Sequence, residues 1–287
     1  MTHRIVWCTD IHLDHLWEAI FVNGLTDGSR RPSEVKVAEF CQKILDKNPD
    51  SVLITGDISI APMIETHLGW LEKHIPGVPI YFVLGNHDYY DGSIQNVRSH
   101  INKYDGVNHH GAIWLNTQGV VKLTDKTALV GHDGWYDGGY SDWFKSRLVM
   151  TEYHVTQEFR FQPPLVVHKR LQELAQECAD HILNHVKVAT QTYKNVLFAT
   201  HVPAFRNNSR APDRRLSDSQ WLPNMSSKKA GDALLHVAKN HPEVKFTCLS
   251  GHTHTSWEEQ YLSNLREITG ASRYGNPSSS IRVIEVE

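Results

Sequence analysis

Aspartate, asparagine and histidine side chains occur in five short motifs that are spread along the sequence. The motifs are Asp10-Ile11-His12, Gly56-Asp57, Gly85-Asn86-His87-Asp88, His201, and Gly251-His252-Thr253-His254. Their side chains offer oxygen and imidazole nitrogen atoms and no thiolate, a donor set that suits divalent manganese, iron, zinc or nickel. The motifs therefore predict a metal site and argue against a structural zinc finger.

The number of donors indicates two metal ions. The motifs supply seven candidate ligands, which are too many for one ion. They suit two ions about 3.5 to 4 Å apart that share a bridging carboxylate. Such a pair clamps the attacking and leaving oxygens of a phosphoryl displacement, and a water bound between the ions becomes hydroxide near neutral pH. The predicted chemistry is hydrolysis of a phosphoric ester.

Apolar runs of strand length must position these motifs. They cover residues 5–8, 52–54, 80–84, 128–130, 196–199 and 246–249, and five of these six runs end just before a motif. In open α/β sheets the carboxyl ends of the strands converge on one edge, so residues far apart in the sequence can meet there. Glycine before Asp57, Asn86 and His252 allows a sharp turn and a close approach of backbone to a charged centre.

Helical periodicity separates several of these runs. Apolar residues recur after a cap at Ser33 up to residue 45, again over residues 64–75, and over the longest stretch, residues 165–188. Alternation of apolar and charged residues over 281–286 predicts a closing strand. Strands that alternate with helices predict an α/β sandwich.

Residues 136–162 form an aromatic, glycine-rich segment without a clear period. We predict that this segment caps the site and, with the following helix, forms an insertion at about 136–190 within a single domain that covers residues 1–287. Its aromatic rings could stack a nucleobase, pack a satellite core or form a dimer contact. The sequence alone does not separate these alternatives.

Two further segments leave alternatives open. Residues 205–224 are polar and predict a long loop, in which an arginine could clamp a substrate phosphate or lie in solvent; these arginines are Arg206, Arg210, Arg214 and Arg215. Residues 131–135 could line the pocket or form a structural turn. The histidine pairs 109–110 and 181/185 could form extra metal sites, but solvated or packed side chains are favoured.

The composition is ordinary for a globular domain. Of the 287 residues, 40% are hydrophobic and 21% are charged, and the net charge of -3 gives no global positive field. Duplex nucleic acid is therefore not favoured as a partner. Four scattered cysteines without a C-x-x-C pair predict packed thiols. No apolar run has the length of a signal peptide or a membrane helix, so we expect no membrane partner and a cytoplasmic location.

The five motifs, in this order, resemble the calcineurin-like metallophosphoesterase superfamily. Its pattern is D-x-H, G-D, G-N-H-[D/E], a lone histidine and G-H-x-H, and here it covers residues 10–254. Five spaced motifs must agree in type and order, so the match is highly specific. The resemblance implies a four-layer sandwich of two mixed β-sheets flanked by helices, which agrees with the elements predicted above.

The resemblance also implies a role for each motif residue. It implies that Asp10, His12 and His254 hold one ion, that Asn86, His201 and His252 hold the other, and that Asp57 bridges them. It implies that His87 is not a ligand but protonates the leaving alkoxide or stabilises the developing charge, and that Asp88 orients and polarises the His87 imidazole.

One departure narrows the resemblance. Protein phosphatases of this superfamily continue the second motif as G-D-x-x-D-R-G, whereas this chain has Ile60, Ala61 and Pro62 at the last three places. The remaining resemblance is closest to small bacterial phosphodiesterases of the cyclic-nucleotide type. We therefore predict a phosphodiesterase acting on a small phosphoester such as a nucleotide. The alternatives are a phosphomonoesterase or pyrophosphatase with the same metal centre, or a non-catalytic binding scaffold. A homodimer is a further option.

Overall fold

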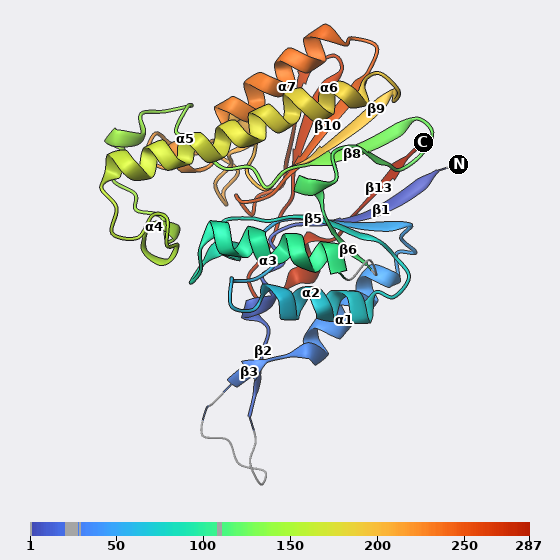
Figure 1. Ribbon diagram of the computed structural model, residues 1–287, viewed down its shortest axis with the longest axis vertical. Coiled ribbons are helices and arrows are strands. Elements are labelled where there is room, and N and C mark those ends of the chain that lie inside the picture. Colours follow the sequence, from blue (N-terminus) through green and yellow to red (C-terminus); the bar gives the residue numbers. More distant parts are fainter. Residues whose placement is uncertain (1, 21–27, 29, 108–110) are drawn as a thin grey trace.

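The computed structural model describes residues 2–20, 28, 30–107 and 111–287, and within them two mixed sheets face each other (Figure 1). The first has the order β13-β1-β4-β5-β6 and the second β11-β12-β10-β9-β8-β7. The strands of the first sheet are β1 (His3–Cys8), β4 (Ser51–Thr55), β5 (Ile80–Val83), β6 (Ala112–Trp114) and β13 (Arg282–Val286). Those of the second are β7 (Val121–Lys122), β8 (Thr127–Gly131), β9 (Asn195–Ala199), β10 (Lys245–Ser250), β11 (Trp257–Leu262) and β12 (Leu265–Thr269).

Helices cover the outer face of each sheet and complete four layers. Figure 1 shows one group of helices against the first sheet and a second group against the other. The first group is α1 (Glu34–Leu45), α2 (Ile64–His74) and α3 (Ile94–Val107); the second is α5 (Pro164–His181), α6 (Lys187–Ala189) and α7 (Lys228–Asn240). The predicted four-layer α/β sandwich is confirmed.

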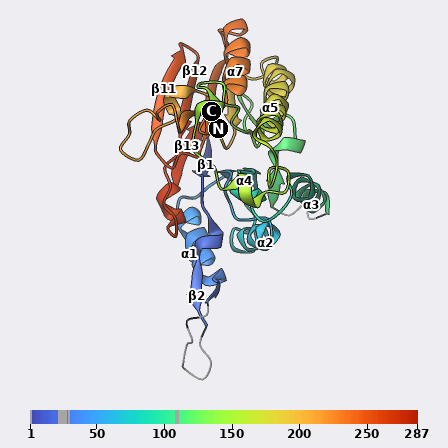
Figure 2. The ribbon, with the colours of Figure 1, turned by 90° about the vertical axis from the view of Figure 1, so that its left-hand side faces the viewer.

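The central strands of both sheets are parallel. β1 pairs in parallel with β4, and β4 with β5, while β8, β9 and β10 pair in parallel in the other sheet. Their carboxyl ends therefore emerge at shared edges. The terminal strands β1 and β13 lie side by side and antiparallel, as Figure 2 also shows for the two chain ends.

Buried apolar side chains explain why the strands read as nearly continuous apolar runs. Residues from both sheets, including Trp7, Leu53, Leu197 and Leu249, form a core between the sheets. Two further clusters fill the spaces under the two groups of helices. Each central strand is therefore covered on both faces, which favours apolar residues at every position.

The predicted helices and strands are present with small shifts at their ends. Ser33 caps α1 by accepting a hydrogen bond from Lys36 N at 3.3 Å, as the sequence predicts. The predicted helix over 165–188 is α5 and α6, joined by a π-helical turn at Ile182–Val186. The short hairpin of β2 (Trp17–Ala19) and β3 (Arg30–Pro32), and the helices α3 and α7, were not predicted.

Among the described residues no helix is both long and apolar enough to cross a membrane.

The four cysteines are all buried and unpaired, which confirms the prediction of packed thiols. Burial raises the pKa of Cys8 to about 12, so its thiol is not a nucleophile at neutral pH. Of the histidine pairs, the rings of His181 and His185 lie 4.3 Å apart, whereas residues 109–110 lie outside the described part of the chain.

The motif at residues 131–135 is structural. The side chain of Asp133 is fully buried at the end of β8 and joins the two sheets. Its Oδ1 accepts hydrogen bonds from Leu84 N at 2.8 Å and Trp114 Nε1 at 2.9 Å, and its Oδ2 accepts one from the Tyr89 hydroxyl at 2.8 Å. Arg98 lies 3.3 Å from the same oxygen. The carboxylate thus fixes the end of β5, where the third motif begins.

We predict that Asp133→Ala lowers the free energy of unfolding by about 3–5 kcal/mol, because three buried donors and the Arg98 guanidinium lose their acceptor. Urea unfolding followed by circular dichroism measures the loss. Asp125→Ala is the control, because that side chain is exposed and forms a surface ion pair with Lys122. Equal midpoints for the two variants would refute the structural role of Asp133.

Candidate metal centre

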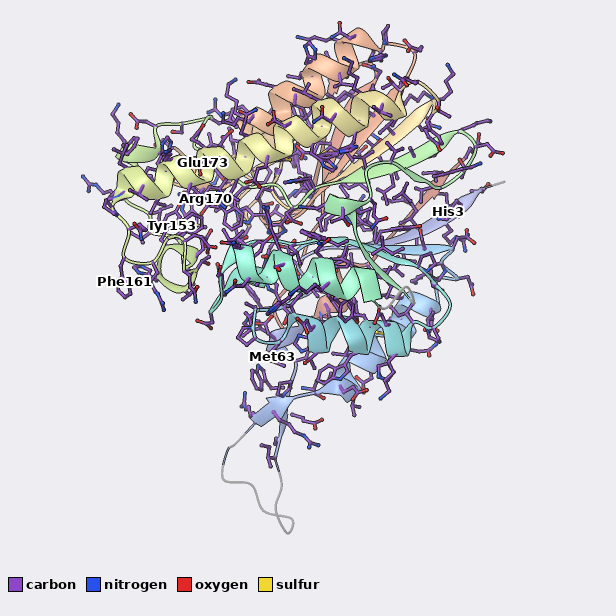
Figure 3. The ribbon with its side chains drawn as sticks, viewed as in Figure 1. His3, Met63, Tyr153, Phe161, Arg170 and Glu173 are labelled. Atoms are coloured by element: carbon purple, nitrogen blue, oxygen red, sulfur yellow. The ribbon has the colours of Figure 1, made fainter. Side chains whose placement is uncertain are left out.

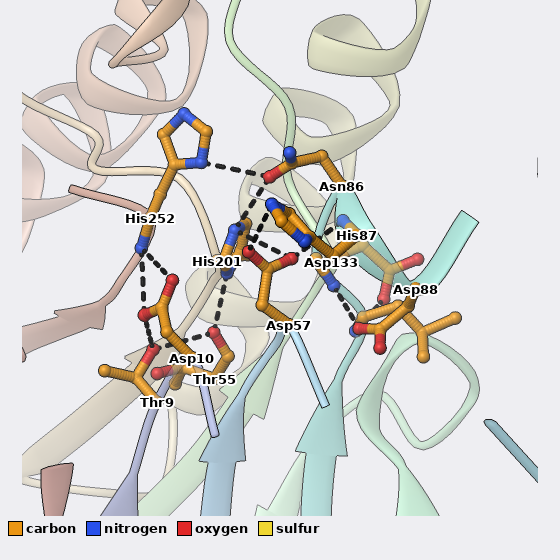
Figure 4. Close-up of polar contacts among 12 residues, drawn as sticks. Thr9, Asp10, Thr55, Asp57, Asn86, His87, Asp88, Asp133, His201 and His252 are labelled. Atoms are coloured by element: carbon orange, nitrogen blue, oxygen red, sulfur yellow. Dashed lines mark hydrogen bonds and ion pairs between the residues drawn. The ribbon is translucent and has the colours of Figure 1, made fainter. Parts of the chain in front are cut away.

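All seven predicted ligands lie at one edge of the sandwich, and Figure 4 shows five of them, Asp10, Asp57, Asn86, His201 and His252. They follow the carboxyl ends of β1, β4 and β5 in one sheet and of β9 and β10 in the other; the residues are Asp10, His12, Asp57, Asn86, His201, His252 and His254. Backbone hydrogen bonds join the loops that carry them: Asp10 N donates to Gly56 O at 3.0 Å, and Gly251 N donates to His201 O at 2.8 Å. Segments far apart in the sequence are thereby held together.

Four of these side chains converge through their donor atoms. Asn86 Oδ1 lies 3.1 Å from His201 Nε2 and 3.0 Å from His252 Nδ1. Asp57 Oδ1 lies 3.3 Å from the same His201 nitrogen. Two imidazole nitrogens and two oxygens therefore face a common point, as ligands of a divalent ion must.

Outward hydrogen bonds fix the tautomers of the two imidazoles. His201 Nδ1 lies 2.9 Å from Thr55 O, and His252 Nε2 lies 2.9 Å from Asn224 O. A carbonyl oxygen can only accept, so each of these nitrogens carries the proton. The opposite nitrogens lie beside the Asn86 oxygen and would offer lone pairs to an ion that displaces any proton they carry. Metal-binding histidines are oriented by outward hydrogen bonds of this kind.

A second group of donors adjoins the first. The ligand atoms of Asp10, His12, Asp57 and His254 all lie within 4.8 Å of one another. His254 Nε2 lies 3.1 Å from His12 Nε2 and 3.2 Å from Asp10 Oδ1. Asp57 contributes Oδ1 to the first group and Oδ2, 3.9 Å from His12 Nε2, to the second. Its carboxylate is therefore placed between the two groups, and the residues fit two ions.

The backbone at the ligands is unusual in a way that the sequence analysis missed. Five of the seven have a positive φ, namely Asp10 (48°), His12 (40°), Asp57 (51°), His252 (69°) and His254 (55°). This left-handed conformation costs on the order of 1 kcal/mol for a non-glycine residue. Asp and His tolerate it better than most residues, which is the only signal that the sequence offered.

The glycines that precede the ligands are required by close contacts, as predicted. A Cβ on Gly56, whose φ is +84°, would lie 2.6 Å from His201 Nδ1. A Cβ on Gly85 would collide with Asp57, and one on Gly251 would collide with Thr9 and Asp10. The backbone therefore approaches the ligand side chains at a distance that only glycine permits.

Buried carboxylates and the imidazoles beside them set the charge of the centre. Asp10 and Asp57 are both fully buried. Burial alone would raise the pKa of Asp57, but the neighbouring imidazoles, His201 first among them, hold that pKa well below its usual value. Burial likewise opposes the charged form of His201, but the nearby Asp57 carboxylate raises the pKa of His201 to about 10. The two carboxylates thus create a field that attracts cations.

His87 lies at the rim of this centre. Its backbone N–H donates to Asp57 Oδ1 at 2.8 Å, and its Nε2 lies 3.9 Å from Asp57 Oδ2. The ring is stacked on Tyr90, with centroids 4.2 Å apart. The side chain remains partly exposed, at 18%, so a substrate can reach it.

The predicted pairing of Asp88 with the His87 imidazole is wrong. The Asp88 carboxylate is buried and accepts hydrogen bonds from Ser59 N at 2.7 Å and Gly85 N at 2.8 Å (Figure 4). These backbone groups belong to the loops that follow β4 and β5. Asp88 therefore positions the loops that carry Asp57 and Asn86, because its short side chain turns toward backbone donors and away from the adjacent ring.

Tyr274 is a residue at the site that the sequence analysis missed. Its ring centroid lies 4.4 Å from that of His12 and 4.9 Å from that of His254, and about half of the residue is exposed. It follows the last motif by twenty residues and carries no spacing signal. Tyr274 therefore forms part of the mouth of the centre.

Two surface hollows adjoin the ligands. The first, which we call the Trp221 hollow, has a volume of about 630 Å³ and is lined by Arg210, Trp221, His252 and His254 among others. The second, the Arg273 hollow, has a volume of about 700 Å³ and is lined by Arg214, Ser256 and Arg273 among others. Pro212, His254 and Tyr274 line both hollows.

The arginines of the predicted loop have different surroundings. The Arg210 guanidinium lies 3.8 Å from the centroid of the Trp257 ring, and Arg215 is paired with Asp213 at 2.5 Å. Arg214 lines the Arg273 hollow and Arg206 is exposed. The loop thus brings three of its four arginines to the hollows beside the ligands.

Comparisons with known proteins agree with this geometry. A sequence model of calcineurin-like phosphoesterases matches residues 3–256. No curated protein matches the sequence. Among solved structures, a dimetal phosphatase from Danio rerio is similar over 99% of this chain and 91% of its own, with a TM-score of 0.56 at 16% identity. A putative 5′-nucleotidase from Staphylococcus aureus, of which 51% is covered by all of this chain, has a TM-score of 0.49 at 12% identity. The Danio rerio structure shows that the fold is shared.

We predict that Gly56→Ala lowers the affinity for divalent ions by about 100-fold, because the added methyl displaces His201 and strains the turn before Asp57. Calorimetric titration with Mn²⁺ measures the change. Gly69→Ala is the matched control, since a Cβ there meets only the Tyr104 hydroxyl, at 3.9 Å. Wild-type Mn²⁺ affinity in Gly56→Ala would show that the turn does not set the ligand geometry.

Proposed function

The chain belongs to the calcineurin-like phosphoesterase family, and from that premise we propose that it hydrolyses phosphodiesters at a centre of two metal ions. Membership of this family supports the hydrolysis of phosphoric esters in general. The observation that carries the proposal is the convergence of seven oxygen and imidazole donors, with the tautomers of two imidazoles set by carbonyl oxygens. A scaffold without catalysis does not need such oriented lone pairs.

The proposed ligand sets follow the two groups of donors. Asp10, His12 and His254 would hold one ion, Asn86, His201 and His252 the other, and Asp57 would contact both. The donors suit manganese, iron, zinc or nickel. When bound, two such ions polarise the phosphoryl oxygens and activate water for attack on phosphorus near neutral pH. The buried carboxylates keep the ions in place by their charge.

His87 is the proposed proton donor to the leaving oxygen. It is the partly exposed histidine beside Asp57, and the stacked Tyr90 ring holds its plane. A general acid must come within hydrogen-bond reach of the leaving oxygen, which a partly exposed side chain at the rim of the centre can do. Since Asp88 bonds to backbone N–H groups instead, the orientation of His87 comes from Tyr90 and from its own backbone bond to Asp57.

The two hollows favour a diester over a monoester. They meet at Pro212, His254 and Tyr274, so a phosphoryl group beside His254 could extend one ester substituent into each. A monoester would occupy only one. The exposed rings of Trp221 and Tyr274 offer stacking surfaces for a planar group, which supports a small nucleotide-like substrate.

Four buried, unpaired cysteines suit a reducing compartment and support the cytoplasm as the proposed location.

We predict that protein stripped with chelator and reloaded with Mn²⁺ hydrolyses bis(p-nitrophenyl) phosphate faster than p-nitrophenyl phosphate, because the diester fills both hollows. Release of p-nitrophenol measures both rates, and the stripped protein is the control. Preference for the monoester would favour a phosphatase. Inactivity on both esters with two ions bound would favour the binding scaffold.

We predict that His87→Ala lowers kcat by about 10²–10⁴-fold, because the leaving oxygen loses its proton donor. Metal content, measured by mass spectrometry of the dialysed protein, should remain at the wild-type value, because His87 lies outside both donor groups. His100→Ala, at an exposed position in α3, is the control. Loss of metal in His87→Ala would reassign His87 as a ligand.

A further inference from the structure

A buried carboxylate outside the motifs connects to one of the proposed ligands. Glu152, in the short helix α4 (Glu152–Val155), is fully buried within the aromatic segment 136–162. Its Oε1 accepts a hydrogen bond from the Tyr136 hydroxyl at 2.6 Å, and its Oε2 accepts one from the Tyr90 hydroxyl at 3.0 Å. Burying a carboxylate is costly, and two hydroxyl donors offset only part of that cost. A buried carboxylate with this incomplete compensation is a candidate for a functional role.

The Tyr90 hydroxyl links Glu152 to Asn86 and sets the orientation of the Asn86 amide. A tyrosine hydroxyl has one proton, and Tyr90 donates it to the carboxylate. Its lone pairs then accept from Asn86 Nδ2 at 3.0 Å. The reverse orientation would set the amide oxygen against the Tyr90 oxygen with no proton between them. The amide oxygen is therefore turned toward His201 and His252.

The same segment also supports His252. The carbonyl of Asn224, which accepts from His252 Nε2, belongs to a residue held by its side chain. Asn224 Oδ1 accepts hydrogen bonds from the Tyr153 hydroxyl at 2.8 Å and from Trp143 Nε1 at 3.2 Å. Figure 3 shows Tyr153 near the start of α5, and Pro164 and Val167 of that helix line the same hollow as Tyr153.

We propose that the segment 143–153 is a brace for one metal ion, with Glu152 as the positioning residue that fixes the Asn86 amide through Tyr90. The brace reaches two of the three residues that would hold this ion alone: it is linked to Asn86 through Tyr90 and to His252 through Asn224. The inference rests on the proposed two-ion centre. In this proposal, the aromatic segment helps the protein to retain the divalent ion beside Asn86 and has no such effect on the other ion.

Tyr90→Phe tests the brace against Tyr136→Phe as a matched variant. Each substitution removes one buried hydroxyl from the same Glu152 carboxylate and keeps the aromatic ring, but only Tyr90→Phe breaks the bond to Asn86. We expect Tyr90→Phe to lower the affinity for one of two Mn²⁺ ions by about 10–100-fold, which is the usual effect of losing an outer hydrogen bond of a ligand. Calorimetric titration, independent of activity, resolves the two ions.

Tyr136→Phe should bind both ions with affinities close to those of the wild type. Glu152→Gln should resemble Tyr90→Phe, because an amide can turn its NH₂ toward Tyr90 and reverse the direction of the hydroxyl. Thermal unfolding of the loaded proteins is the check that each variant folds. Equal loss of metal in Tyr90→Phe and Tyr136→Phe, or retention of both ions in Tyr90→Phe, would overturn the brace. A wild-type protein that binds no Mn²⁺ would instead overturn the proposed function.

Discussion

The burial of two carboxylates between the edges of two sheets is the constraint on which this structure depends. Asp10 and Asp57 are almost fully inaccessible, and an ionised carboxylate buried without a partner costs several kcal/mol even after relaxation. The imidazoles of His201 and His254 supply part of the compensation, at 3.3 and 3.2 Å. Divalent cations would supply the rest, because bound ions carry the largest charges in such a site. The burial of the two carboxylates and the proposed metal centre are therefore two aspects of one arrangement.

The fold meets this constraint by bringing five strand ends to one place. Parallel pairing of β1, β4 and β5 places the first three motifs at one edge of one sheet, and parallel pairing of β9 and β10 places the others at the edge of the second. Left-handed turns at five ligands then direct the side chains inward at a local energetic cost. The cost is met by the cores on either side and by backbone hydrogen bonds between the loops.

The parts of the molecule that could be predicted are those set by local chemistry or by burial on both faces. Parallel central strands read as apolar runs, and Ser33 is a local cap, so both were visible in the sequence. The ligands could be predicted because aspartate, asparagine and histidine residues come directly after the apolar runs in the sequence. The role of Asp88 could not be predicted, because it depends on which donors the turn after β5 directs at its carboxylate. The place of Tyr274 could not be predicted either, because only the tertiary fold brings it to His12. The edge strand β11 has the polar run Glu258-Glu259-Gln260 at its centre and lacks the apolar pattern of a buried strand.

The ligands differ in how much help they need from the rest of the chain. An imidazole at the end of a strand is oriented by a neighbouring carbonyl, as His201 is by Thr55 O, and a sheet of almost any sequence supplies that carbonyl. An asparagine amide has two orientations of nearly equal shape, so its oxygen faces a metal ion only if another side chain distinguishes its two ends. Tyr90 makes that distinction four residues after Asn86, but a hydroxyl can itself point either way until Glu152 takes its proton. The motif therefore specifies which atoms meet, whereas a segment outside it determines which way the amide faces.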